Sequence, residues 1–167
     1  MKNKERDLID NLIFDWKQER PELDTSAMQI VGRLLNLGKT LEKRASLVLQ
    51  DGPIHYTDLD VLATLRRSGK PYELSPTQLM DSVLITSGSM TALLDRLAKL
   101  YLIYRTTDQA DKRIKRAGLT RKGIEVIDKA IEIRFNEAQE SIAVFNEKEK
   151  KVLSNLLRKM TLHLKGN

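Results

Sequence analysis

The chain contains no cysteine and only two histidines among its 167 residues. Without cysteine it can form no disulfide, no thiolate nucleophile and no cysteine-ligated metal site. His55 and His163 do not belong to any recognisable catalytic pattern, and no HExxH, CxxC or glycine-rich phosphate loop is present. These absences argue against an enzyme and against a sensor of soft metals, and we expect no cofactor.

Long hydrophobic runs and aromatic residues are also scarce. No stretch of about 18 apolar residues exists, and the polar start 1–7 lacks the apolar segment of a signal peptide. We therefore expect a cytoplasmic protein that does not bind membranes. Hydrophobic residues make up 41% and charged residues 31%, a composition that allows a core and is typical of a helix-rich globular chain.

Basic charge is concentrated in one segment of the chain. Nine basic residues stand against two acidic ones between Arg96 and Lys122, whereas the whole chain carries a net charge of +6. The rest is therefore close to neutral. Such a local concentration favours binding to nucleic-acid phosphates over membrane lipids, although a basic run alone can also be a solvated face.

Two short helical patterns surround the start of this segment. Ser75 and Pro76 fit an N-cap and a first helical turn, and an apolar face follows through Val83. After a break at 84–86, a second apolar stripe begins near Ser87 and ends near Leu100. Two helices joined by so short a turn predict a helix-turn-helix, whose second helix enters the major groove amino end first.

The basic segment also has the pattern of a β-hairpin. Residues 102–107 are rich in strand formers, 108–111 form a turn, and 115–119 can return as the partner strand. The predicted fold class is mainly α with a small β-hairpin wing, a winged helix-turn-helix in the α+β class.

Four short motifs in order resemble the signature of the MarR family of winged-helix transcriptional regulators. They are Leu93-Leu94-Asp95-Arg96-Leu97, Ile103-x-Arg105, Asp108-x-x-Asp111-x-Arg113 and Leu119-Thr120-x-x-Gly123. The resemblance implies a homodimer that reads a pseudo-palindromic operator in double-stranded DNA. Tyr101 stands where the family usually has glycine, which predicts an altered or strained end of the recognition helix.

The flanking segments are helical patterns that suit dimerisation. An amphipathic stripe that includes Trp16 ends before Pro21, and a second helix starts after Asp24 or Thr25. A third runs over 57–67, a long stripe follows 123, and a last helix begins at Asn146. We divide the chain into N-terminal helices at 1–52, a DNA-binding lobe at 53–123 and C-terminal dimerisation helices at 124–167.

Side-chain chemistry and the resemblance together indicate which residues contact DNA. Hydroxyls, a glycine and a methionine at the amino end of the recognition helix can approach bases and phosphates. By resemblance, Arg113 enters the minor groove and Asp111 orients a neighbouring arginine. The predicted DNA-binding residues are Ser87, Gly88, Ser89, Met90, Thr91, Arg96, Lys112, Arg113, Lys115 and Arg116.

Structural roles compete with several of these assignments. Ser87 or Ser89 can serve only as a helix cap, and Arg96 can pair with Asp111 or Asp95 instead of a phosphate. The leucines of the recognition helix are expected to pack inward.

A small-molecule effector is also implied by resemblance. Trp16, Asp60 and Arg105 match ligand-contacting positions of a urate-responsive subgroup that has an extra N-terminal helix. Leu93 replaces the arginine of that subgroup and offers neither charge nor donor, so a more apolar aromatic acid is at least as plausible a ligand. Alternatively, Trp16 belongs to the dimer core, and Asp60 and Arg105 form a simple ion pair.

The sequence as a whole predicts a DNA-binding transcriptional regulator, most simply a repressor, whose affinity for DNA responds to an aromatic or anionic ligand. The alternative is a basic module that binds nucleic acid without specificity or binds an acidic protein.

Overall fold

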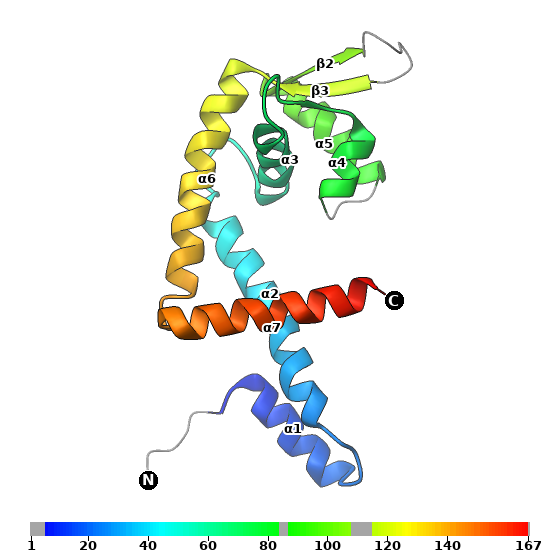
Figure 1. Ribbon diagram of the computed structural model, residues 1–167, viewed down its shortest axis with the longest axis vertical. Helices are drawn as coiled ribbons and strands as arrows, with labels where there is room; N and C mark the ends of the chain where they lie inside the picture. Colours follow the sequence, from blue (N-terminus) through cyan, green and yellow to red (C-terminus); the bar gives the residue numbers. More distant parts are fainter. Residues whose placement is uncertain (1–5, 84–86, 108–114, 167) are drawn as a thin grey trace. The chain divides into compact units, whose positions relative to one another are not determined.

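The computed structural model describes residues 6–83, 87–107 and 115–166. It divides into two compact units, Met1–Arg44 and Ala45–Asn167, which are considered separately below. The helices are α1 (Leu8–Glu19), α2 (Ser26–Val48), α3 (Tyr56–Arg67), α4 (Pro76–Ser82), α5 (Ser87–Lys99), α6 (Arg121–Ser141) and α7 (Glu147–Lys165). The strands are β1 (Glu73–Leu74), β2 (Ile103–Thr107) and β3 (Lys115–Leu119), and Figure 1 shows the order of the elements.

The first unit is a hairpin of α1 and most of α2. Asp7 caps α1 by accepting a hydrogen bond from the backbone N–H of Asp10 at 2.8 Å. Arg33 on α2 pairs with both carboxylates, at 2.7 Å and 2.6 Å, and so ties the two helices together. Ile9 and Ile13 are buried, whereas Trp16, on the same predicted stripe, is 52% exposed in the single chain.

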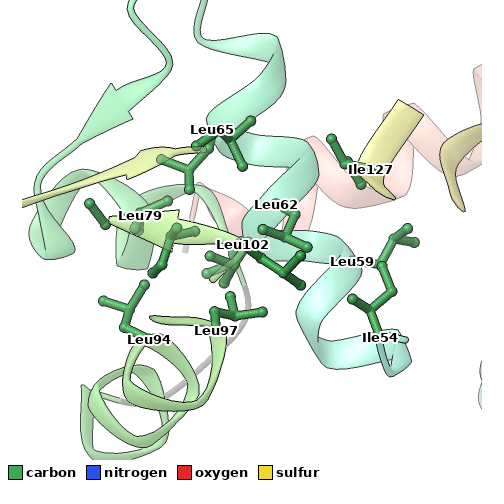
Figure 2. Close-up of a cluster of buried hydrophobic side chains, with 14 of the residues drawn as sticks. Ile54, Leu59, Leu62, Leu65, Leu79, Leu94, Leu97, Leu102 and Ile127 are labelled. Carbon is green, nitrogen blue, oxygen red and sulfur yellow. The ribbon is translucent and has the colours of Figure 1, made fainter. Parts of the chain in front are cut away.

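The second unit holds the main hydrophobic core. Figure 2 shows leucine and isoleucine side chains converging from α3, α4, α5, α6 and the segment that leads into β2. Each fully buried leucine contributes about 1.5–3 kcal/mol relative to an exposed one. This core fixes the helix-turn-helix on α3. Its central members are Leu62, Leu65, Leu79, Leu97, Leu102 and Ile127.

The strands form a three-stranded antiparallel sheet in the order β1-β3-β2. Figure 1 shows its two longer strands, β2 and β3, beside the helices of the second unit. The hairpin strands were predicted, but β1 was missed because two residues carry no readable alternation. Tyr104 on β2 crosses Gly118 on β3 and donates a hydrogen bond to Glu73 on β1 at 2.6 Å. A Cβ on Gly118 would lie 2.5 Å from the Tyr104 ring, so glycine allows this close crossing.

Local sequence signals for helix ends are confirmed. Ser75 caps α4 with Pro76 in its first turn, and Asn146 forms a reciprocal capping box with Glu149. The carboxylate of Asp24 accepts the N–H of Ser26 at 2.9 Å just before α2. Tyr101 has φ +59°, so it adopts the left-handed conformation expected at this glycine position.

The last helix, α7, contributes no buried residue in the single chain, although it carries a full apolar stripe. Within the described residues, no helix is both long enough and apolar enough to cross a membrane.

Candidate nucleic-acid interface

The recognition helix α5 has two distinct faces. Leu94 and Leu97 are buried in the hydrophobic core, while Ser89 and Thr91 at the amino end are exposed. Ser87 and Gly88 belong to α5, but their side chains lie outside the described part of the structure. Short hydroxyl side chains on the exposed side of a groove-sized helix are suited to contacts with bases and phosphates.

One predicted contact on this helix is wrong. Met90 was expected to touch a thymine methyl group, but its side chain is only 1% exposed and belongs to the hydrophobic core. The apolar stripe of α5 therefore includes Met90, and burial of its thioether takes precedence over a role at the surface.

The wing lies beside α5 and extends the basic surface. Lys115 is exposed and Arg116 is partly buried on β3, and both line a hollow of about 360 Å3 between α5 and the wing strands. Thr91 on α5 lines the same hollow. Asp111, Lys112 and Arg113, at the tip of the predicted hairpin, lie outside the described residues.

Arg105 joins the wing to the recognition helix. Its guanidinium forms an ion pair with Asp95 at 2.9 Å and approaches the backbone oxygen of Thr91 at 3.5 Å. The proposed simple ion pair between Arg105 and Asp60 is therefore replaced by one with Asp95. This pairing tethers α5 to β2 and helps to keep the exposed face of the helix next to the wing.

Arg96 takes a structural partner on another helix. It pairs with Asp58 on α3, a carboxylate with no exposed surface, and not with Asp95; the other predicted partner, Asp111, lies outside the described residues. The Asp58 carboxylate also accepts the backbone N–H of His55 at 2.7 Å. Arg96 is therefore engaged at the α3–α5 contact.

The residues predicted to bind an effector stand in different surroundings. Trp16 belongs to the first unit, and Asp60 and Arg105 belong to the second. Asp60 is half-buried; burial raises its pKa, and the positive charges of Arg67 and Arg134 partly oppose that rise. Arg105, in contrast, is engaged with α5, so the structure does not bring Asp60 and Arg105 into a described contact.

A second hollow lies between α3 and α6, and its lining residues were not among those predicted from the sequence. It has a volume of about 350 Å3 and combines two arginine side chains with apolar walls. Arg66 is held by Asp128 at 2.8 Å and 3.2 Å, whereas Arg67 makes a longer contact, 3.5 Å, with the backbone oxygen of Ser82 at the end of α4. The signal available was the Arg66-Arg67 pair at the end of the predicted third helix. The lining residues are Ala63, Arg66, Arg67, Ile127, Ile131 and Phe135.

The helix pair α4–α5, the hairpin β2–β3 and the basic side chains beside α5 define a winged helix-turn-helix DNA-binding lobe. The model of the MarR family matches residues 53–114, which cover this lobe up to the wing. The transcriptional regulator PecS of Dickeya dadantii (strain 3937) is 30% identical over 95% of this chain and 96% of its own. The chain belongs to the MarR family of transcriptional regulators, which are not enzymes.

Solved structures show the same fold at lower sequence identity. A mutant MarR from E. coli complexed with operator DNA superimposes with a TM-score of 0.70 at 21% identity, covering 93% of this chain and 99% of that one. The organohalide-sensing regulator RdhR-CbdbA1625 in its 2,4-dichlorophenol-bound form gives a TM-score of 0.73 at 21% identity. In that comparison, 98% of this chain and 88% of the other are covered.

Proposed function

We propose that this protein binds a pseudo-palindromic operator as a homodimer and represses transcription, with its DNA affinity lowered by a small aromatic acid. The observation that carries the proposal is that Thr91, at the amino end of α5, lines one hollow with Lys115 and Arg116 of the basic wing strand, while Ser89 in the same helix turn is exposed. Such an arrangement offers groove contacts from the helix and phosphate contacts from the wing.

The proposed DNA contacts differ between the wing and the recognition helix. Lys115 and Arg116 contribute phosphate contacts that do not depend on sequence, and Lys112 adds another. Arg113 enters the minor groove, oriented with the help of Asp111, by resemblance to the family. The hydroxyls of Ser87, Ser89 and Thr91 contact base edges and phosphates, and Gly88 permits close approach of the backbone.

Exposed apolar surface supports the homodimer. In the single chain, Leu156 and Leu162 on α7 are 59% and 65% exposed, and Leu8 on α1 is 58% exposed. Helices that carry such stripes are unfavourable in water unless they are covered. A second copy related by a two-fold axis would cover them and would present two α5 helices to half-sites one helical turn apart.

Competition binding tests the DNA-binding proposal. A duplex selected by the protein from a random library is labelled, and its fluorescence anisotropy is measured at fixed salt against unlabelled selected duplex and shuffled duplex. We expect a preference for the selected sequence of at least about 10³-fold. Equal competition by the shuffled duplex would instead support the alternative, a basic module that binds nucleic acid without specificity.

The α3–α6 hollow supports a second element of the proposal, the effector site. Its arginines can pair with a carboxylate, and its apolar walls can cover an aromatic ring. Arg67 is the better candidate partner because Arg66 is already held by Asp128. Since Arg67 also contacts Ser82 at the end of α4, a ligand that withdraws Arg67 would loosen the helix-turn-helix. Asp60 lies near enough for its charge to act on Arg67.

Titration calorimetry with benzoate and with neutral benzyl alcohol distinguishes the contribution of the carboxylate from that of the aromatic ring. We expect saturable binding of benzoate, weaker binding of the neutral alcohol, and loss of the difference in Arg67→Met. A linked measurement, operator affinity with and without benzoate, must change by the same factor as benzoate affinity changes on DNA binding. No heat of binding for either compound would remove the aromatic-acid proposal and leave DNA binding untouched.

A further inference from the structure

A buried ion pair links the recognition helix to α3. Asp58 lies in the first turn of α3 and has no exposed surface, and Arg96 lies near the end of α5 with a side chain that is 36% exposed. One carboxylate oxygen, Oδ2, accepts the His55 N–H at 2.7 Å and pairs with the Arg96 guanidinium. Burying a carboxylate is costly unless a charged partner compensates it, so Arg96 is required where it stands.

The second carboxylate oxygen indicates that the ion pair does more than stabilise the fold. Oδ1 of Asp58 is buried and has no hydrogen-bond partner in the described part of the chain. A well-packed apolar pair at such a place is often as stable as a buried ion pair or more so. The ion pair instead fixes the relative position of α3 and α5, because a charged hydrogen bond forms only over a narrow range of distances and angles.

Hydrophobic contacts alone would not fix the rotation of α5 about its axis. Its contacts with the core come from Met90, Leu94 and Leu97, and hydrophobic attraction is not directional. A small rotation of α5 about its axis would keep these side chains buried but would turn Ser89 and Thr91 away from a DNA groove. Two ion pairs resist that rotation. Asp58 of α3 pairs with Arg96, and Arg105 of the wing pairs with the adjacent residue, Asp95.

We propose that Asp58 and Arg96 are positioning residues that set the rotation of the recognition helix, and that Arg96 acts on DNA through Asp58 and not by contacting phosphate. The inference rests on the proposed sequence-specific binding, because rotation of α5 affects the reading of bases far more than non-specific attraction to the backbone. It assigns specificity to a residue pair in which Asp58 is fully buried and Arg96 is turned toward α3.

The first test uses the sign of a charge change. Asp58→Asn removes a negative charge, so an electrostatic effect alone would strengthen binding to every duplex. We expect instead that affinity for the selected operator falls about tenfold while affinity for shuffled duplex is unchanged or slightly higher, comparable to the cost of one mismatched base pair. An unchanged ratio between the two duplexes, in a wild-type background that shows specificity, would overturn the inference.

The second test compares salt dependence. A lost phosphate contact lowers the slope of log affinity against log salt by about one, and Lys115→Ala is the matched control for that behaviour. Arg96→Met is expected to lower operator affinity with the slope unchanged. A slope reduced as in Lys115→Ala would show that Arg96 is a phosphate ligand.

The third test remains informative if Asp58→Asn or Arg96→Met fails to fold. Arg96→Lys keeps the positive charge but loses the planar guanidinium fork and some reach. A positioning role predicts a fall in the operator-to-shuffled ratio, whereas a phosphate contact predicts near-normal affinity because a point charge suffices. If the wild-type protein itself showed no operator preference, the proposed function would fail first, and that result is distinguishable from all of these.

Discussion

Replacement of Gly123 by alanine is the sharpest stability prediction for the fold. Gly123 is buried in the first turn of α6, where its N–H donates to the Thr120 cap at 2.9 Å. An added Cβ would lie 2.9 Å from the carbonyl carbon of Leu102, nearer still to its oxygen, and 3.3 Å from Leu119 Cδ2. Because carbon atoms normally approach to about 3.5–4.0 Å, α6 would have to move away from the start of β2.

The loss in the free energy of unfolding depends on which atoms must move to make room for the new Cβ. The obstacle is backbone, which cannot rotate away as a flexible side chain can, so the cost belongs at the upper end of overpacking, about 3 kcal/mol. Removing a helical glycine recovers only about 0.5–1 kcal/mol. We therefore expect a net loss of about 2–2.5 kcal/mol, or a fall in Tm of roughly 4–10 °C for a chain of this size.

Urea denaturation followed by circular dichroism, at one fixed protein concentration, measures this loss. Lys129→Ala is the control, because Lys129 is an exposed residue of the same helix and its replacement should change stability by no more than about 0.5 kcal/mol. Equal or higher stability of Gly123→Ala would show that α6 does not pack on Leu102 as described.

Three further predictions concern charge and assembly. Burial raises the pKa of Asp60 above its ordinary value of 3.8, so the folded state binds more protons there than the unfolded state. Asp60→Asn should therefore raise the free energy of unfolding at neutral pH, and the gain should vanish as pH falls through the folded pKa toward 3.8; a gain that persists in acid would contradict this. Lys115→Ala should weaken operator and shuffled duplex alike and lower the salt slope by about one, measured by anisotropy; a loss confined to the operator would assign Lys115 to base reading. Leu156→Glu should convert the proposed dimer to monomer in analytical ultracentrifugation, with Lys159→Gln, which changes the charge by the same one unit, as the control; an unchanged dimer would place the interface elsewhere.

Local signals explain why much of the fold could be predicted. Ser75-Pro76 and Asn146 with Glu149 determine helix starts through contacts three residues away, so sequence alone identifies them. Tyr101 was predicted to alter or strain this helix end because the family places glycine there, and the structure retains the left-handed conformation in a residue that rarely adopts it. Strand β1 was not predictable, since it exists only through pairing with a distant β3.

The site was harder to predict because side chains choose among partners that are far apart in the chain. Met90 fits both a helix face toward DNA and the apolar stripe, and only the packed core decides for burial. Arg96 had acidic neighbours in sequence, yet its partner is Asp58 from another helix. The α3–α6 hollow required the position of α6 relative to Arg67, which periodicity does not give.

Hydroxyl-radical footprinting of the selected operator most directly tests the central claim that a two-fold dimer places two recognition helices on DNA. The account predicts two protected tracts related by symmetry and centred about 10 base pairs apart. Both should be lost with Leu156→Glu at protein concentrations where that variant remains monomeric. A single tract, or uniform weak protection along the duplex, would contradict it.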